Sequence, residues 1–149
     1  MRVVFLDTGP LGMVSNPKSS PENEECRQWL KRLVDGGTRV IVPEIADYEV
    51  RRELVRAGKS AGIARLDRLQ ESLDYVPITT AAMLVAANLW AEARRAGLPT
   101  AADPALDGDA ILAAQALTYG LRNGEELIAT ANVGHLSRFV NAKDWREIA

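Results

Sequence analysis

The sequence predicts an α/β fold in which a parallel sheet is covered by helices on both faces. Short apolar runs rich in β-branched residues alternate with longer stretches whose apolar residues recur at helical spacing. This alternation is typical of units in which a helix carries the chain back to the start of the next parallel strand. The 149 residues, 47% of them apolar, suffice for one domain spanning 1–149 with a sizeable core.

Two buried strands with a helix between them are predicted in the first third of the chain. Residues 2–6 form an apolar run that Gly9-Pro10 stops. Ser19-Ser20-Pro21 then opens a helix, with the proline in its first turn, and Gly36-Gly37 ends it. Residues 39–42 form the second buried run.

The remaining elements continue the alternation. A short strand at 75–78 contains Pro77, which cannot donate to a sheet ladder and therefore indicates an edge or a strand end. Thr79 or Thr80 caps a helix that runs to about Arg95. Its predicted inward face carries Met83, Leu84, Ala87, Trp90 and Ala91. The other predicted elements are helices from about Ile45 and over 63–73, a loop over 97–108, a helix over 110–119, and a last clear strand over 127–130 before a short tail.

Composition excludes several functional classes. No apolar run is long enough to span a bilayer, and the N-terminus lacks the features of a signal peptide. The single Cys26 excludes an internal disulfide and a cysteine metal site, which fits a reducing cytoplasm. The formal net charge is −2, so any contact with nucleic acid must come from a local basic patch.

Three acids and one amide follow predicted strands at places where they can meet. Asp7 ends the first strand, Glu49 lies one to two turns into the helix after the second, Asp109 opens the helix of 110–117, and Asn132 follows the last strand. All four can reach the carboxyl edge of a parallel sheet, where ligands bind. Three carboxylates there repel one another unless a divalent cation is present, and oxygen ligands suit Mg²⁺ or Mn²⁺. Such a cation activates water and stabilises charge on a phosphodiester.

Each of the four residues also has an ordinary structural interpretation. Asp7 caps the next turn, and Glu49 is one solvated charge on a helix. Asp109 is favoured at a helix N-terminus by the macrodipole, and Asn132 is a turn residue. For any one of them alone this interpretation is the commoner one, but the four in this order favour a site.

The chain resembles PIN-domain nucleases of the VapC-type toxin class, nearly end to end. The resemblance rests on Phe5-Leu6-Asp7-Thr8, on residues 43–50, on residues 109–114, and on residues 129–132 with Phe139 beyond. It implies a three-layer α/β/α sandwich around a parallel sheet and metal-dependent cleavage of RNA. Asp7, Glu49 and Asp109 are then the acidic set that binds Mg²⁺ or Mn²⁺. It also implies an antitoxin that covers the site, and a homodimer is expected because two-fold pairs are the commonest oligomers.

The chain departs from that class at one of the four residues. Members often carry an acid where this chain has Asn132, and an amide is a weaker cation ligand. Asp107 is a candidate replacement, whereas Asp103 is expected to start a turn. Glu44 rivals Glu49 for the second acid because it directly follows the strand, but the resemblance to the family implies that the acid is Glu49. Glu53 lies one turn beyond Glu49, where it can line the same face.

Basic and apolar residues suggest surfaces for partners. The candidate RNA-contact segment holds Arg51, Arg52, Arg56, Lys59, Arg65 and Arg68, and its alternative is a solvated pair of helices. Faces bearing Trp29 and Leu30, or Ile63, Leu66 and Leu69, offer a groove to a partner helix unless they pack inside the domain. His135 is the only histidine, cannot build a histidine-based zinc site, and is expected to be a turn or packing residue.

Two other functions compete with the ribonuclease. Haloacid-dehalogenase-type phosphotransfer also places an Asp after an apolar first strand, but that class needs a second Asp two residues later, where this chain has Gly9, and a functional Lys. A non-catalytic PIN-like module that binds RNA or a protein is the other alternative. The joint presence of Asp7, Glu49 and Asp109 argues against it.

Overall fold

Five parallel strands form one sheet in the order β3-β2-β1-β4-β5, which confirms the predicted parallel α/β architecture. The structure is a computed structural model and describes residues 2–97, 103–120 and 125–149, with no side-chain description for 103 and 104. The strands are β1 (Val3–Leu6), β2 (Arg39–Pro43), β3 (Asp74–Val76), β4 (Glu126–Thr130) and β5 (Ala142–Asp144).

The central strand β1 is covered on both faces. All four of its residues are buried, and Phe5 pairs in register with Ile41 of β2 on one side and Ile128 of β4 on the other. A strand buried on both faces reads as a continuous apolar run, which is why this segment could be identified from its residue types. The short strand β3, followed by Pro77, lies at an edge as predicted.

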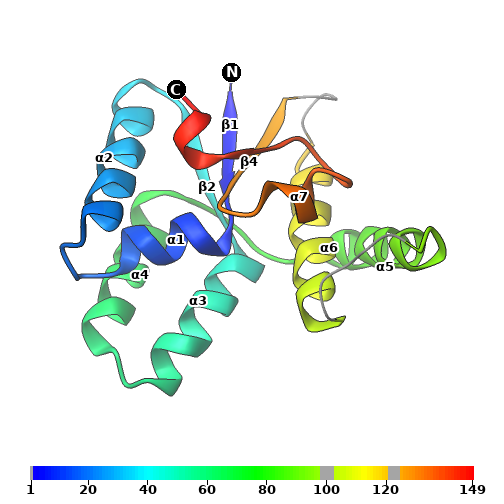
Figure 1. The fold of residues 1–149 in the computed structure, drawn as a ribbon, viewed down its shortest axis with the longest axis horizontal. Coiled ribbons are helices and arrows are strands. Elements are labelled where there is room, and N and C mark those ends of the chain that lie inside the picture. Colours follow the sequence, from blue (N-terminus) through cyan, green and yellow to red (C-terminus); the bar gives the residue numbers. More distant parts are fainter. Residues whose placement is uncertain (1, 98–102, 121–124) are drawn as a thin grey trace.

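Helices cover the sheet on both sides, so the three-layer α/β/α arrangement is present (Figure 1). One core cluster joins Val4 and Leu6 to α1, α2 and α4, and another joins Val3 and Phe5 to α6 and α7. Helix α5 packs on α6 through a third, alanine-rich cluster. The helices are α1 (Thr8–Ser15), α2 (Pro21–Asp35), α3 (Glu44–Arg56), α4 (Ser60–Ser72), α5 (Thr80–Arg95), α6 (Asp103–Leu117) and α7 (Val133–Leu136), with a 3₁₀ turn at Trp145–Glu147. Among the described residues, none of these helices has the length and apolarity needed to cross a membrane.

Side-chain caps start two helices where the sequence predicted them. The Ser20 hydroxyl accepts a hydrogen bond from the Asn23 backbone N–H at 3.1 Å. The Thr79 hydroxyl does the same for Ala82 at 3.0 Å. Each bond satisfies one of the N–H groups that a first helical turn leaves unpaired.

One element prediction was wrong, and two elements were missed. Helix α1 begins at Thr8, so Gly9-Pro10 lies in its first turn, where a proline forfeits no helical hydrogen bond. Helix α6 begins at Asp103, so the loop predicted over 97–108 is helical from 103 onward, while 98–102 lie outside the described residues. Strand β5 lies in the segment read as a tail, where three residues carry too little pattern to identify.

The predicted inward face of α5 was wrong at Met83 and Leu84, although Trp90 does pack against α6. Met83 and Leu84 are 46% and 65% exposed, whereas Ala82, Ala86 and Ala93 are buried. Small alanines on α5 meet Ala110 and Ala114 of α6, so close backbone packing decides the face. The helix faces that were expected to offer a groove to a partner helix pack inside the domain instead, because Trp29, Leu30 and Leu66 are core residues. The Trp29 indole N–H donates to the Ile148 carbonyl at 2.9 Å.

Candidate functional site

Asp7 sits at the carboxyl end of β1 and caps α1 as well. Its backbone N–H donates to the Ala129 carbonyl at 3.0 Å, which continues the β1–β4 pairing. Its carboxylate Oδ1 accepts from the Thr8 N–H, and Oδ2 accepts from the Thr130 hydroxyl, both at 2.7 Å. Burial raises the pKa of Asp7 despite these hydrogen bonds. The capping role and a place in the site are therefore compatible, because a carboxylate has lone pairs beyond the two used here.

Glu49 comes from α3 and reaches the same place. Its Oε1 accepts a hydrogen bond from the Thr8 hydroxyl at 3.0 Å, so the residue after Asp7 holds the second acid. Burial raises the pKa of Glu49, the charge of Asp7 raises it further, and Thr8 and Arg52 oppose the shift. A Cβ at Gly108 would lie 2.7 Å from Glu49 Oε2. The carboxylate of Glu49 thus rests against the α6 backbone, and a Cβ at position 108 would displace it.

Asp109 comes from α6, one residue after that glycine. It lies about two turns into the helix, so the explanation by the macrodipole at a helix N-terminus does not apply. Burial, followed by the charge of Asp7, raises the pKa of Asp109 to about 6, and Glu49 adds to the shift while His135 and Arg138 oppose it. These mutual effects mean that the three carboxylates lie close enough to repel one another.

Asn132 and His135 lie next to residues of the acidic site. The Asn132 backbone N–H donates to the Thr130 hydroxyl at 2.9 Å, and its side-chain Nδ2 lies 3.2 Å from His135 Nδ1. His135 Nδ1 is also 3.8 Å from Asp109 Oδ2. From the sequence His135 was expected to be a turn or packing residue, and its position next to Asp109 was not predicted. The available signal was its spacing, since three residues along a helix return to the face of Asn132.

Glu44 and Asp107 point elsewhere, whereas Glu53 lies near Glu49. Glu44 Oε1 accepts from the Ile78 N–H at 2.7 Å, so this side chain fastens the connection that follows β3. Asp107 is exposed and lines a hollow against Met83 and Trp90 of α5. Glu53 pairs with an arginine of its own helix and, as expected, lines the same groove as Thr8 and Glu49. The side chain of Asp103 lies outside the described part of the chain.

The residues of the basic segment have different surroundings. Arg51 binds Asp47 at 3.0 Å and Asp67 at 2.7 Å, so it joins α3 to α4 within the fold. Lys59 lines a groove of about 740 Å³ whose wall includes Thr8 and Glu49. Arg65 and Arg68 line a separate hollow, against α2.

The donor chemistry at this site fits a hard divalent cation, because carboxylate oxygens are the ligands such ions prefer. The side chains are nevertheless not gathered as a coordination shell. Among the described residues, no three Asp, Glu, His or Cys side chains lie close enough together to hold an ion as placed. Like-charged carboxylates are expected to stand apart, and a cation of opposite charge would draw them together.

Comparison with known proteins identifies the family. The family model of the PIN domain matches residues 4–139. A search of the curated proteins returned no match to this chain. The fold resembles VapBC2 from Rickettsia felis bound to a promoter DNA fragment, with TM-score 0.74, 15% identity and coverage of 96% of this chain and 98% of that one. DNA-bound VapBC from Salmonella typhimurium gives TM-score 0.69, 19% identity and coverage of 97% and 99%.

A third solved structure of similar fold is described as a toxin. Mycobacterium tuberculosis VapC20, described as cleaving the sarcin–ricin loop, gives TM-score 0.55, 19% identity and coverage of 80% of this chain and 85% of that one. Identities this low establish a shared fold, whereas the family model spans most of this sequence, including Asp7, Glu49, Asp109 and Asn132. The chain therefore belongs to the PIN-domain family.

Proposed function

We propose that this protein is a metal-dependent endoribonuclease, using Mg²⁺ or Mn²⁺, and the toxin of a toxin–antitoxin pair. One observation carries the proposal: Asp7, Glu49 and Asp109 come from three different elements and interact electrostatically at one place on the sheet. Burial is the main cause of the raised pKa of each carboxyl, and the charges of neighbouring carboxylates raise the pKa of Glu49 and Asp109 further. Membership of the PIN family and the fold shared with VapC20 support RNA as the substrate.

In the proposed reaction these three carboxylates would hold the cation, which when bound supplies an activated water and neutralises charge developing on the phosphodiester. The chain's own contribution is orientation. Thr8 bridges Asp7 and Glu49, donating its N–H to the first and its hydroxyl to the second. Thr130 fixes the other oxygen of Asp7. These hydrogen bonds determine which carboxylate lone pairs remain available to a ligand.

The antitoxin and the homodimer are also part of the proposal. The structures of similar fold include VapBC complexes, which supports a partner protein. Exposed apolar side chains on α3 and α5 support self-association, namely Tyr48, Val55, Met83 and Leu84. Light scattering over a range of concentrations tests the dimer, and a mass that stays monomeric at every concentration refutes it.

The decisive experiment compares wild type with Asp7→Asn on a mixed RNA substrate. Wild type should cleave in Mg²⁺ or Mn²⁺ and stop when EDTA is added, whereas Asp7→Asn should be inactive although folded. Asp107→Asn is the matched control, because its side chain is exposed on the α5 side of α6. Wild type that binds RNA without cleaving it would instead indicate a non-catalytic binding module.

Expression in cells tests the toxin assignment separately. Wild type expressed without an antitoxin should arrest growth, and Asp7→Asn should relieve the arrest. Harmless expression of a protein that is active in vitro would leave a general RNA-processing nuclease.

A further inference from the structure

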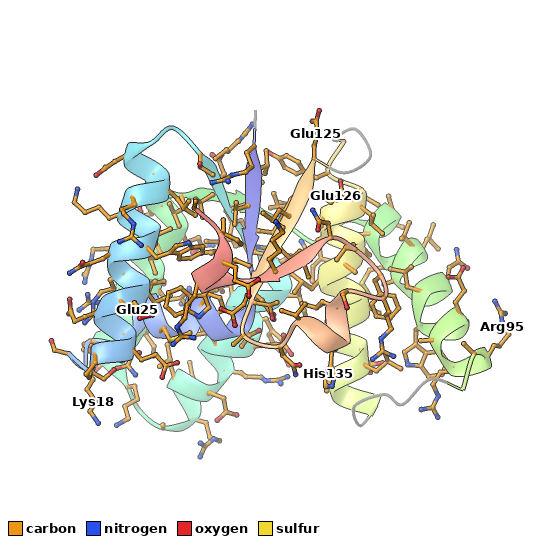
Figure 2. All side chains as sticks on the ribbon, turned by 45° about the horizontal axis from the view of Figure 1, so that its top comes forward. Lys18, Glu25, Arg95, Glu125, Glu126 and His135 are labelled. Carbon is orange, nitrogen blue, oxygen red and sulfur yellow. The ribbon has the colours of Figure 1, made fainter. Side chains whose placement is uncertain are left out.

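The outer face of helix α3 carries an exposed aromatic ring next to the acidic site. Tyr48 immediately precedes Glu49 in the chain and is 55% exposed. The guanidinium carbon of Arg52 lies 5.2 Å from the centre of the Tyr48 ring, and a nitrogen of the same guanidinium lies 3.8 Å from Glu49 Oε2. One arginine therefore connects the ring with the second acid of the proposed site. In Figure 2 helix α3 lies at the lower edge of the molecule, where side chains project outward.

Tyr48 and its neighbours form a shallow hollow of about 400 Å³, the α3 hollow, which is lined by Tyr48, Arg51, Arg52, Val55 and Arg56. Three of these side chains are positively charged and none is acidic, in a chain whose formal net charge is −2. Among the residues that the structure describes, Tyr48 belongs to none of the three apolar clusters. The hollow thus places positive charge beside an aromatic ring that the core does not use.

Two of the three arginines are available to a ligand. Arg51 is held within the fold by two acids. Arg56 pairs with Glu53 at 2.9 Å, but both side chains are more than half exposed. The distance of 3.8 Å between Arg52 and Glu49 is longer than a hydrogen bond. Because ion pairs this exposed contribute little to stability, an anionic ligand can displace them at small cost.

The chemistry of the α3 hollow fits single-stranded RNA. Unpaired bases stack on aromatic rings and on the planes of guanidinium groups, and RNA phosphates bind arginine. The pair of Tyr48 and Arg52 offers both kinds of contact. A second copy of this chain fits less well, because a two-fold contact centred on the hollow would set Arg52 and Arg56 against the same arginines of that copy.

We propose that the α3 hollow binds a nucleotide of the RNA strand beside the one that is cut, with Tyr48 stacking on its base and Arg52 contacting a phosphate. The inference rests on the proposed function, because it takes the cut phosphodiester to lie at the acidic site. Bases within a duplex are already stacked on one another, so the hollow selects unpaired RNA.

RNA binding in EDTA tests the role of the ring without metal-dependent cleavage. The probe is a fluorescein-labelled single-stranded RNA of mixed sequence, and the readout is fluorescence anisotropy. Tyr48→Ala should weaken binding about tenfold or more, because a stacked base loses its platform. Tyr48→Phe keeps the ring and should bind like wild type. Val34→Ala, at an exposed apolar position of α2, is the control and should also bind like wild type.

The dependence of binding on salt tests the arginine separately. Arg52→Ala should reduce the slope of log affinity against log salt concentration by about 0.7, the value for one phosphate contact on a single strand. Arg68→Ala removes the same charge from the separate hollow against α2 and should leave the slope unchanged. A duplex of the same sequence should bind wild type more weakly than the single strand does, and Tyr48→Ala should change duplex binding little.

The outcomes distinguish this proposal from the proposed function. The proposal fails if Tyr48→Ala binds the single strand as tightly as wild type, or if wild type binds no RNA. It also fails if Tyr48→Ala halves the mass in light scattering, because weaker binding would then follow from a lost interface between copies. Cleavage by wild type together with normal binding by Tyr48→Ala would leave the proposed function standing. RNA that is bound through the hollow but not cut in Mg²⁺ or Mn²⁺ would remove the nuclease and keep the hollow as an RNA site.

Discussion

Replacing Asp109 by asparagine should stabilise the metal-free protein while abolishing its activity. The substitution keeps the shape of the side chain and removes its charge. Burial and the neighbouring acids raise the pKa of Asp109 from 3.8 to about 6, and its side chain is only 22% exposed. A shift of this size corresponds to about 3 kcal/mol by which the ionised carboxylate destabilises the folded state. Because asparagine is also buried there, we expect a net gain of roughly 1–3 kcal/mol at pH 7.5.

The gain should depend on pH with a definite sign. A carboxyl whose pKa is raised by folding binds its proton more tightly in the folded state, so its favourable contribution is complete below about pH 4. That contribution is lost as pH rises through the folded-state pKa of about 6. The difference between Asp109→Asn and wild type should therefore be small near pH 4 and full above pH 7.

Urea denaturation in EDTA at pH 4.5, 6 and 7.5 measures this difference directly. Added Mn²⁺ should raise the stability of wild type, because it binds only the folded state, and should have little effect on Asp109→Asn. Asp107→Asn, on the same helix but exposed, controls for a general effect of charge removal. An Asp109→Asn protein that is less stable than wild type at pH 7.5, or that cleaves RNA at the wild-type rate, would refute the reasoning.

Three further substitutions test the roles of neighbouring side chains. In the RNA assay Glu49→Gln should be inactive and Glu44→Gln should be active. Glu44 accepts a hydrogen bond from the Ile78 N–H, and a glutamine there can still accept it. If only Glu44→Gln is inactive, the second acid is Glu44. Gly108→Ala should lower cleavage at least about tenfold with no loss of thermal stability, because its Cβ would meet Glu49 Oε2 at 2.7 Å. Gly12→Ala is the control, because a Cβ there meets nothing within 4 Å and the variant should show only the gain in stability, about 0.5–1 kcal/mol, that alanine gives over glycine in a helix. A Gly108→Ala protein as active as wild type would contradict the predicted displacement of Glu49. Arg51→Ala should cost roughly 2–3 kcal/mol in urea denaturation, because Asp47 is 9% exposed and would lose its partner, and a change in RNA affinity alone would contradict this structural role.

The sequence by itself determined the architecture and the order of the acids. Strand β1 could be identified because a strand covered on both faces is apolar throughout. The start of α2 could be identified because serine is favoured at the cap of a helix and proline in its first turn, as Ser20 and Pro21 are. Asp7 could be singled out because it follows a strand whose carboxyl end lies at one edge of a parallel sheet, and Glu49 because the resemblance to the PIN family implies an acid at that position. These inferences use residues only a few positions apart, so no tertiary contact is needed.

Only the tertiary structure decided which side chains meet. The sequence allowed either Glu44 or Glu49 as the second acid, and the packing of α3 turns one toward Ile78 and the other toward Thr8. The partners of Arg51 and His135 could not be predicted for the same reason. Arg51 pairs with Asp67 on the next helix, and α7 places His135 next to Asp109. The physical reason is that a residue's type and spacing fix its place on an element, whereas its partner depends on how separate elements pack, which no local pattern contains.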